Sequence, residues 1–362
     1  MSVLRHIPKV EHRSAARVTG LTTHDGRKSE HLRISLEEQV GFSHLTTGFE
    51  GYRFVHQALP QVDWSAIDLS TTFLGRRLAA PLLISPMTGG TAAAEGINRA
   101  LAQAAQACGA AMGLGSLRAA LEDPGLAHTY RVREVAPDIL LLANLGAVQL
   151  NYGYGLAHCQ KALALAEADA LVLHLNPLQE VLQPGGNREW AGLLGKIEQV
   201  CRGLGAPVVV KEVGWGISRE VARELVDAGV AAIDVAGAGG TDWAKVELHR
   251  AESDRARRVA ATFQDWGIPT AEALLLAQQG APGLPIIASG GIYDGITAAK
   301  ALALGAHMVG LARPFLPPAL VSAEAVAEAI GELLDTLRTV MFCVGAATVA
   351  SLQHSPHLRP AA

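Results

Sequence analysis

One pattern recurs along the chain from Ala80 onward and limits the folds that it can adopt. A short, nearly continuous apolar run ends in Gly, Ser, Asn or Lys, and a segment with helical spacing follows it. Apolar runs without alternation are typical of strands buried on both faces, and their alternation with helices indicates a parallel sheet. Eight runs follow this pattern: Pro81–Ser85, Ala110–Ser116, Ile139–Asn144, Ala170–Asn176, Pro207–Lys211, Ala231–Ala236, Pro285–Ser289 and His307–Leu311.

The segments between these runs have the spacing of amphipathic helices. They lie at Glu95–Cys108, Gly155–Ala168, Glu189–Leu204, Ser218–Ala228, Thr270–Gln279, Gly295–Leu304 and Ala323–Val340, with a weaker one near Gly125–Val135. Successive run ends from Ser85 to Ala236 are 25 to 35 residues apart, which is typical of one strand–helix unit. Eight units predict an α/β fold of the (β/α)₈ TIM-barrel type. A doubly wound sheet, in which the units lie flat, is the alternative.

Two segments do not follow this period. Ala236 and Ser289 are 53 residues apart, so a long insertion follows the sixth strand. Its part Glu247–Gln264 is rich in Arg and Asp and predicts an exposed loop or helix that acts as a lid. At the start of the chain, residues 1–26 predict a flexible N-terminal arm. Residues 27–362 predict one barrel domain with an N-terminal extension packed on it.

Composition and charge exclude several classes of protein. Lys plus Arg total 30 and Asp plus Glu total 34, for a net charge of -4 without a basic stripe, which disfavours a nucleic-acid binder. No apolar stretch approaches the roughly twenty residues of a membrane span, and residues 1–21 carry no apolar core of signal-peptide length. The 4 cysteines form no CxxC pair, which argues against a disulfide framework or a zinc site. We expect a cytoplasmic homo-oligomer that binds neither nucleic acid nor membranes.

Glycine-rich segments follow the last three predicted strands. They are Gly237–Thr241, Ser289–Gly291 and Gly310–Arg313. Glycines let a backbone approach a phosphate and offer its N–H groups, and barrels commonly bind phosphate at the last two strand ends. We therefore expect a phosphorylated ligand; the alternative is that these glycines only form tight turns. Because no GxGxxG follows the first strand, a mononucleotide such as FMN fits better than a dinucleotide.

Charged residues stand at three further positions of interest. Lys211 ends an apolar run and is expected to face a ligand, because an unpaired buried charge is costly; a structural salt bridge and a Schiff-base lysine are the alternatives. Glu180 follows the fourth strand, where one carboxylate can hold Mg²⁺ together with phosphate oxygens, or complement a helix dipole as a solvated residue. Arg27, Lys28 and His31 form a cationic group, which is either a solvated surface or a clamp for a diphosphate.

Seven motifs in this chain together resemble those of type 2 isopentenyl-diphosphate isomerases. They occur in the family's order between about Arg27 and Ser351, and the His-Leu-Asn-Pro-Leu-Gln-Glu stretch is highly specific. The motifs are Arg27-Lys28-x-x-His31, Met87-Thr88-Gly89-Gly90, Gly115-Ser116-x-Arg118, Ala143-Asn144-Leu145-Gly146, His174 to Glu180, Lys211-Glu212-Val213-Gly214 and Gly237-Ala238-Gly239-Gly240-Thr241.

The resemblance implies a TIM barrel that interconverts isopentenyl and dimethylallyl diphosphate with FMN, reduced by NADPH, and Mg²⁺. It implies that the N5 atom of reduced FMN carries the proton and that Gln179 orients the substrate. The FMN residues implied are Met87, Thr88, Gly89, Ser116, Asn144, Lys211, Thr241, Gly291, Ile292, Tyr293, Ala312 and Arg313. Those implied for the diphosphate are Arg27, Lys28, His31, Arg118 and Gln179, with Glu180 for Mg²⁺.

The chain departs from the family pattern at a few positions. Ala236 replaces a frequent Ser, which removes one expected hydrogen bond to the flavin phosphate. Leu117 stands where many members have Gln, Tyr293 where Arg or Asn is usual, and Gln57 where an Asn is frequent. The Gln179-Glu180 pair and Lys211 are unaffected.

Two other functions compete with the isomerase. A flavin oxidoreductase of the hydroxy-acid oxidase type needs a His with an Arg near the end of the seventh strand, which reads Ala-Ser-Gly-Gly-Ile-Tyr here. A non-catalytic flavin-binding protein needs neither the cationic group at 27–31 nor the Gln179-Glu180 pair. Both alternatives therefore leave conspicuous residues unexplained.

Overall fold

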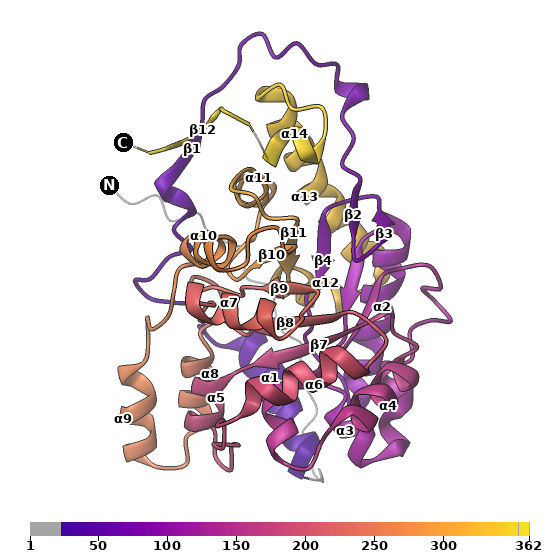
Figure 1. Ribbon diagram of the computed structural model, residues 1–362, viewed down its shortest axis with the longest axis vertical. Helices are drawn as coiled ribbons and strands as arrows, with labels where there is room; N and C mark the ends of the chain where they lie inside the picture. The colour runs from indigo at the N-terminus through magenta and orange to yellow at the C-terminus, as the bar shows by residue number, and fades with distance from the viewer. Residues whose placement is uncertain (1–22, 354, 362) are drawn as a thin grey trace.

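Eight parallel strands close into a barrel, as the sequence predicts. The structure is a computed structural model that describes residues 23–353 and 355–361 (Figure 1). Neighbouring strands follow the order β10-β11-β4-β5-β6-β7-β8-β9, which returns to β10 and confirms the barrel rather than the flat sheet. The strands are β4 Leu82–Ile84, β5 Ala111–Gly113, β6 Leu141–Gly146, β7 Ala170–Leu175, β8 Val208–Glu212, β9 Ala232–Asp234, β10 Ile286–Ser289 and β11 Met308–Leu311.

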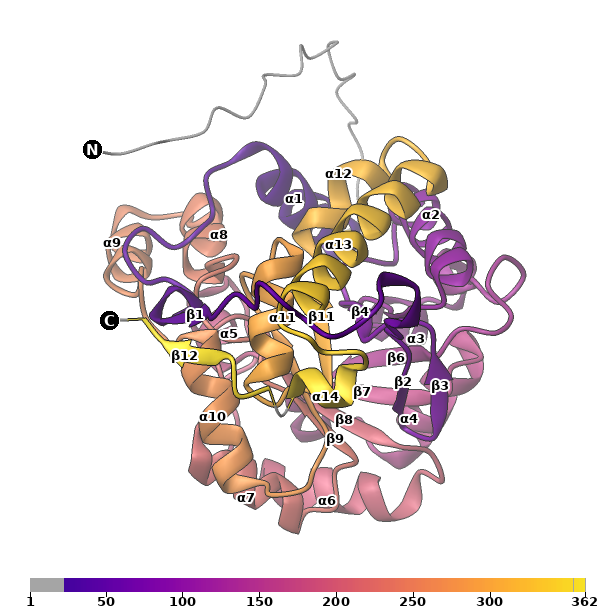
Figure 2. The same ribbon diagram turned by 90° about the horizontal axis from the view of Figure 1, so that it is seen from above.

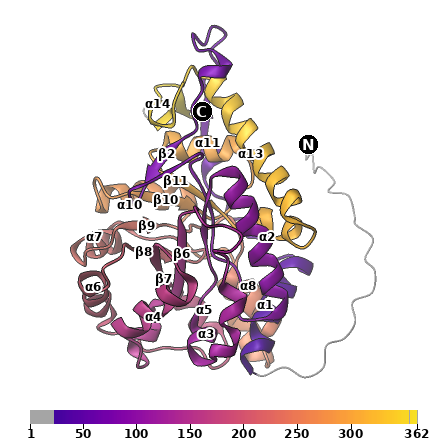
Figure 3. The same ribbon diagram turned by 90° about the vertical axis from the view of Figure 1, so that its right-hand side faces the viewer.

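Helices surround the barrel; within the described residues they include those that the helical spacing predicts and four further short helices that it does not. Their ends carry ordinary capping groups: the Thr91 side chain accepts a hydrogen bond from the Ala94 amide at the start of α2, and Gly109 ends the helix with a φ of 62°. Figure 3 shows α2 and α13 side by side. The helices are α2 Ala92–Cys108, α3 Arg118–Glu122, α4 Leu156–Ala166, α5 Pro177–Leu182, α6 Leu193–Gly203, α7 Arg219–Asp227, α10 Thr270–Gly280, α11 Gly295–Ala303, α12 Leu316–Ala319, α13 Ala323–Cys343 and α14 Val349–Gln353. The weaker segment becomes a 3-10 helix, η3, at Pro124–Tyr130.

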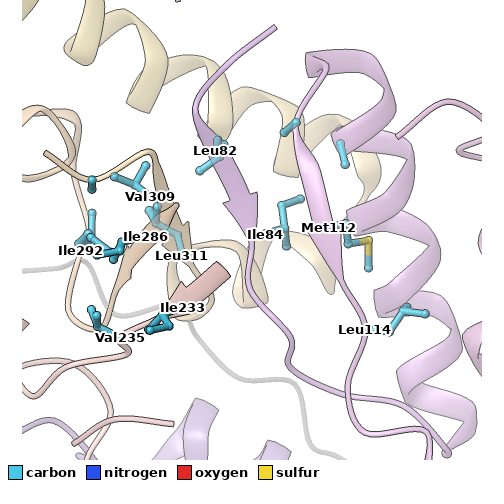
Figure 4. Close-up of a cluster of buried hydrophobic side chains, with 14 of the residues drawn as sticks. Leu82, Ile84, Met112, Leu114, Ile233, Val235, Ile286, Ile292, Val309 and Leu311 are labelled. Carbon is cyan, nitrogen blue, oxygen red and sulfur yellow. The ribbon is translucent and has the colours of Figure 1, made fainter. Parts of the chain in front are cut away.

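Two separate hydrophobic clusters follow from the alternation of side chains along each strand. Leu82 and Ile84 point outward into the cluster between the strands and the helices, part of which Figure 4 shows. Leu83, between them, belongs to a second cluster that takes residues from every barrel strand and fills the interior. A short hairpin of β2 (Thr71–Phe73) and β3 (Arg76–Leu78) contributes Phe73 and Leu78 to this inner cluster.

The chain before the barrel packs on it, as expected. Strand β1 (Tyr52–Phe54) pairs with β12 (Leu358–Pro360) near the other end of the chain, and the two lie side by side in Figure 2. Helix α1 (Thr23–Glu37) begins inside the segment 1–26 that was assigned to an arm, while residues 1–22 lie outside the described part. No helix among the described residues is both long and apolar enough to cross a membrane.

The insertion after the sixth strand is more ordered than the sequence predicts. It forms α8 (Trp243–Arg250) and α9 (Asp254–Thr262) instead of one exposed loop or helix. Glu247, which we expected in the exposed lid, has only 1% of its surface accessible. Its helix is held by Val246, which packs with Ile34 of α1 and Val40 in a small hydrophobic cluster. The expected exposure is wrong for α8, where Glu247 is buried and paired with Arg250, but it is confirmed for α9, whose charged residues are largely exposed.

Candidate functional site

A cavity of about 310 Å³ opens where the carboxyl ends of the barrel strands meet. Every strand of the barrel contributes to its wall, which is the arrangement expected of a barrel active site. One lining residue at or just beyond each strand end, in chain order, is Ser85, Ser116, Asn144, His174, Lys211, Ala236, Ser289 and Leu311.

The structure brings nearly all the residues expected from the family motifs to this cavity. Gly89 is absent from the lining because it packs on Tyr130, whose Cε1 would lie 2.1 Å from a Cβ on this glycine. The backbone of Arg27 belongs to α1, but its side chain lies outside what the structure describes. The predicted residues that line the cavity are Lys28, His31, Met87, Thr88, Ser116, Arg118, Asn144, Gln179, Glu180, Lys211, Thr241, Gly291, Ile292, Tyr293, Ala312 and Arg313.

Interlocked glycine loops after β9 and β10 form one side of the cavity. A Cβ on Gly240 would lie 2.5 Å from the amide nitrogen of Gly291. Gly290 has a φ of 99°, and a Cβ there would lie 2.1 Å from the carbonyl oxygen of Gly237. Because side chains are excluded at these positions, the backbone itself faces the cavity. Such a cradle fits a phosphate group, as the glycine pattern predicts.

Lys211 lies beside this cradle and already has an anionic partner within the chain. Its Nζ is 3.0 Å from Asp234 Oδ2 and donates to Ser289 Oγ at 3.1 Å. Ser289 in turn donates to Asp234 Oδ1 at 2.5 Å, and Asp234 is 1% exposed. Lys211 forms the structural salt bridge that was the alternative to a ligand-facing lysine, and it also lines the cavity. The neutralised pair removes the cost of burying a lone charge.

Polar groups at the ends of β4 and β6 complete the side that would hold FMN. Asn144 Oδ1 is 2.7 Å from His174 Nδ1, and Asn144 itself is buried. Ser85 Oγ is buried beside the cavity and has no hydrogen-bond partner within the described part of the chain. A buried hydroxyl without a partner normally costs free energy, so a bound polar group would satisfy it. The orphaned hydroxyl and the glycine cradle together fit a flavin mononucleotide.

Side chains of α1, α5 and α8 form a connected network on the opposite side. Glu247 Oε1 is 2.9 Å from His31 Nε2 and accepts a hydrogen bond from Gln179 Nε2 at 3.3 Å. Glu247 Oε2 accepts from Arg250 Nη1 at 2.6 Å. Burial works to raise the pKa of Glu247, but the hydrogen bond and charge of His31 and the charge of Arg250 lower it below its ordinary value. Glu247 is therefore the ionised centre of this network.

The Gln179-Glu180 pair lies in the first turn of the short helix α5 and is buried. Asn176, just before the helix, donates from Nδ2 to Gln179 Oε1 and to Glu180 Oε1, both at 3.1 Å. Glu180 Oε2 accepts from the Asn187 amide at 2.5 Å. Only 7% of the Glu180 surface is exposed. The alternative interpretation, a solvated residue that complements the helix dipole, is therefore wrong.

Oxygen atoms dominate this corner of the cavity. Asn176 Oδ1 is buried and lacks a hydrogen-bond partner within the described residues. It is therefore available as an oxygen ligand in addition to the Glu180 carboxylate. No group of three or more His, Cys, Asp or Glu residues in the described ranges could by itself hold a metal ion. Mg²⁺ needs few protein ligands when a diphosphate supplies the others. The donor set therefore fits a magnesium ion shared with a phosphorylated ligand.

Two of the predicted cations, Lys28 and Arg118, have protein partners in this structure. Lys28 Nζ donates to the carbonyl oxygens of Gly89 and Ser116, at 2.7 and 3.0 Å, and to the Tyr130 hydroxyl at 2.7 Å. Arg118 Nε donates to Glu122 Oε1 at 2.8 Å. Lys28 therefore joins α1 to the loops after β4 and β5, a structural role that the sequence did not predict.

Sequence reasoning also missed Asp234, Glu247 and Tyr130. Asp234 ends the short strand Ala-Ile-Asp, so it carries the same signal as Lys211, a charge at the end of an apolar run. Glu247 gave no comparable signal, because its neighbours suggested a solvated helix. Tyr130 lies in the 3-10 helix η3, and only its contacts with Lys28 and Gly89 show its place beside the site.

Comparison with known proteins agrees with this geometry. Residues 24–125 and 178–360 match the model of the FMN-dependent dehydrogenase family. An isopentenyl-diphosphate delta-isomerase of Nostoc sp. is 54% identical over 333 residues, which cover 92% of this chain and 95% of the relative. One of Synechococcus sp. is 55% identical over 334 residues, with 92% and 96% covered.

Solved structures show the same fold at much lower identity. A flavocytochrome b2 mutant superposes with a TM-score of 0.66 at 18% identity, covering 91% of this chain and 82% of the other. At that identity the likeness shows the barrel fold, whereas the relatives at more than half identity define the group. The chain therefore belongs to the FMN-dependent dehydrogenase family and, within it, to the type 2 isopentenyl-diphosphate delta-isomerases.

Proposed function

We propose that this chain interconverts isopentenyl and dimethylallyl diphosphate by a 1,3-allylic proton shift, with reduced FMN and Mg²⁺, in isoprenoid biosynthesis. The observation that carries the proposal is the pairing of two unlike sides in one cavity. The glycine cradle suits a flavin phosphate, and the α1, α5 and α8 side chains suit a second, diphosphate-bearing ligand.

The reaction adds a proton at one carbon and removes one from another, with no net redox change. Reduced FMN, when bound, supplies the group that gives and takes this proton. The chain positions that group: the glycine loops bind the phosphate end, and Lys211 and Asn144, both buried in the cavity wall, provide polar contacts. Protonation of a weakly basic alkene requires an acid that is held close and aligned, which such positioning would provide.

The other side of the cavity binds and orients the substrate. Arg27, Lys28, His31 and Arg118 supply cationic groups for the diphosphate, and Gln179 aligns its chain. Glu180 holds Mg²⁺, which neutralises part of the phosphate charge. We propose NADPH as the physiological reductant of FMN, the cytoplasm as the location and a homo-oligomer as the working assembly.

A hydroxy-acid oxidase activity is the main rival, because it would also use FMN in a barrel of this kind. The segment after β10, Ser289 to Tyr293, carries no His or Arg that could take a proton from a hydroxy acid. A non-catalytic flavin protein would not need the buried Gln179-Glu180 pair. Neither rival accounts for the network on the substrate side.

One experiment separates these functions. The purified protein is expected to contain FMN, as judged by its absorbance after release, and to isomerise isopentenyl diphosphate only after anaerobic reduction and with Mg²⁺ present. NADPH and dithionite are compared as reductants. Oxidation of a 2-hydroxy acid coupled to flavin reduction, without isomerisation, would overturn the proposal.

A further inference from the structure

The segment Val40–Phe49, here called the strap, crosses the outer side of the glycine loops. Gly41 forms an isolated antiparallel bridge with Thr241. The Asp242 amide donates to the Val40 carbonyl oxygen at 2.7 Å, and the Ala271 amide donates to the Thr47 carbonyl oxygen at 2.9 Å. The strap is thus attached to the backbone that follows β9 and to the start of α10.

Thr47 of the strap touches both glycine loops. A Cβ on Gly239 would lie 2.4 Å from the Thr47 amide nitrogen, and one on Gly291 would lie 2.4 Å from Thr47 Cγ2. The loops therefore lie between the cavity and the strap with no free space on the outer side. Any outward movement of the cradle requires movement of the strap.

The middle of the strap is held by one carboxylate. Asp265 Oδ1 accepts hydrogen bonds from the amides of Ser43, His44 and Leu45, at 2.8, 2.9 and 3.0 Å. Asp265 has a φ of 63°, a conformation that L residues rarely adopt and that costs free energy unless the surroundings enforce it. Lys245 adds a second attachment by donating to the Gly41 carbonyl oxygen and to Ser43 Oγ.

The two ends of the strap are anchored independently of Asp265. Val40 is buried with Ile34 and Val246, and Phe49 is buried in the main core. Lys300 Nζ also donates to the Phe49 carbonyl oxygen at 2.9 Å. Ser43 and His44, in contrast, are exposed to solvent. The three hydrogen bonds to Asp265, together with the one from Lys245 to Ser43 Oγ, therefore hold the exposed middle of the strap in place.

We infer that Asp265 is a positioning residue for the flavin: it holds the strap against the glycine loops and thereby slows the release of FMN. The insertion after the sixth strand then serves as an anchor for the strap, since it supplies both Lys245 and Asp265. The inference deepens the proposed function and rests only on its FMN site, without requiring the isomerase reaction.

The test measures the rate of FMN release from three variants of the full-length holoenzyme. Asp265→Gly removes the acceptor but relieves the backbone, because glycine adopts positive φ freely. Asp265→Asn keeps an acceptor oxygen and also tolerates this conformation. Asp254→Asn removes one exposed carboxylate of α9 and is the control for charge. Release is followed by the recovery of flavin fluorescence after dilution.

We expect Asp265→Gly to release FMN about tenfold faster, since three charge-assisted hydrogen bonds at an exposed site are lost, and Asp265→Asn and Asp254→Asn to stay within about twofold of the wild type. The thermal unfolding of the flavin-free Asp265→Gly variant should match that of the flavin-free wild type.

Equal release from Asp265→Gly and the wild type overturns the inference. So does equal acceleration in both Asn variants, because the effect would then follow charge. A matching loss of stability in the flavin-free Asp265→Gly variant also overturns it, since the residue would then be merely structural. A wild type that binds no FMN contradicts the proposed function instead, so the two failures are distinguishable.

Discussion

The two sides of the cavity are built from different parts of the chain. The side proposed to hold FMN includes the backbone of the glycine loops 237–241 and 290–291, next to Lys211 and its partner Asp234. The substrate side consists of side chains, with Glu247 at the centre of contacts from His31 and Gln179. Glycine backbone shapes much of the first side, whereas the second side is a network of polar side chains that hydrogen-bond to one another.

This difference determines how each side can respond to a ligand. Backbone amides in interlocked loops keep their directions whether or not a ligand is bound, so the flavin side is preorganised. On the other side, the proposed function requires Lys28 and His31 to share or exchange their present partners when a diphosphate binds. We therefore expect FMN binding to be lost when an added side chain crowds the glycine loops. We expect activity on the other side to be lost when individual charged side chains are removed.

The largest effect is expected when a side chain is forced into the flavin side. In Gly291→Ala the new Cβ would lie 2.4 Å from Thr47 Cγ2, at a residue with a φ of 70°. We expect purified protein without bound FMN and without isomerase activity. Gly283→Ala is the matched control, because Gly283 has a φ of 81° but open space around its Cβ position. Full flavin content in both variants would mean that the cradle does not hold the phosphate.

A smaller but still large effect is expected from the Gln179-Glu180 pair. Glu180→Gln should retain FMN, lose most activity and recover part of it at high Mg²⁺, because a neutral amide binds the cation weakly. Gln179→Ala should lower turnover without changing the Mg²⁺ dependence, since it orients the substrate by hydrogen bonds. Isomerase assays across a Mg²⁺ titration distinguish the two. An unchanged titration in Glu180→Gln would remove the metal assignment.

A smaller loss of activity is expected from variants of the cationic group Arg27, Lys28 and His31 in α1. Arg27→Ala should lower kcat/KM about ten- to hundredfold, the value of one charged contact in a partly shielded site, with little change in Tm. Lys28→Met should lower both kcat/KM and Tm, because Lys28 also binds the carbonyl oxygens of Gly89 and Ser116. Steady-state kinetics and thermal unfolding of the two variants test this contrast. Equal changes in Tm would show that the two residues share one role.

The smallest effect on activity is expected from Glu212, which ends β8 between the cavity-lining residues Lys211 and Val213. Burial raises its pKa from 4.5 to about 7, although its carboxylate accepts hydrogen bonds from the amides of Val213, Gly214 and Trp215. Between these values the unfolded chain has lost the proton and the folded chain keeps it. The contribution of Glu212 to stability therefore falls as pH rises from about 4.5 to 7, by about 3 kcal/mol, and is constant above that.

Comparison with Glu212→Gln isolates this contribution. The free energy of unfolding of the wild type, relative to that of the variant, should decrease across this pH range in denaturant titrations. Parallel curves for the two proteins would show that Glu212 keeps its ordinary pKa. Either result leaves the FMN site in place, because a Gln at this position still offers an acceptor oxygen to the three amides.

The barrel and much of its cavity could be predicted because their signals are local. Each buried strand is an apolar run, and its last residues are placed at the cavity by the strand itself, as Lys211 and Asn144 show. Glu247 and Tyr130 could not be predicted in this way. Their roles depend on contacts with α1, more than 100 residues away along the chain, and nothing in the neighbouring sequence marks those contacts.

By itself, the sequence determined the number and order of the strand–helix units, the glycine loops at the last strand ends, and the family to which the chain belongs. These properties follow from residue type and spacing along a continuous segment. Only the tertiary structure decided which charges neutralise one another, as Asp234 does for Lys211. It also decided that the strap packs on the glycine loops and is held there by hydrogen bonds to Asp265. Such pairings depend on the closure of the barrel and the packing of the insertion, which bring distant segments within hydrogen-bond distance.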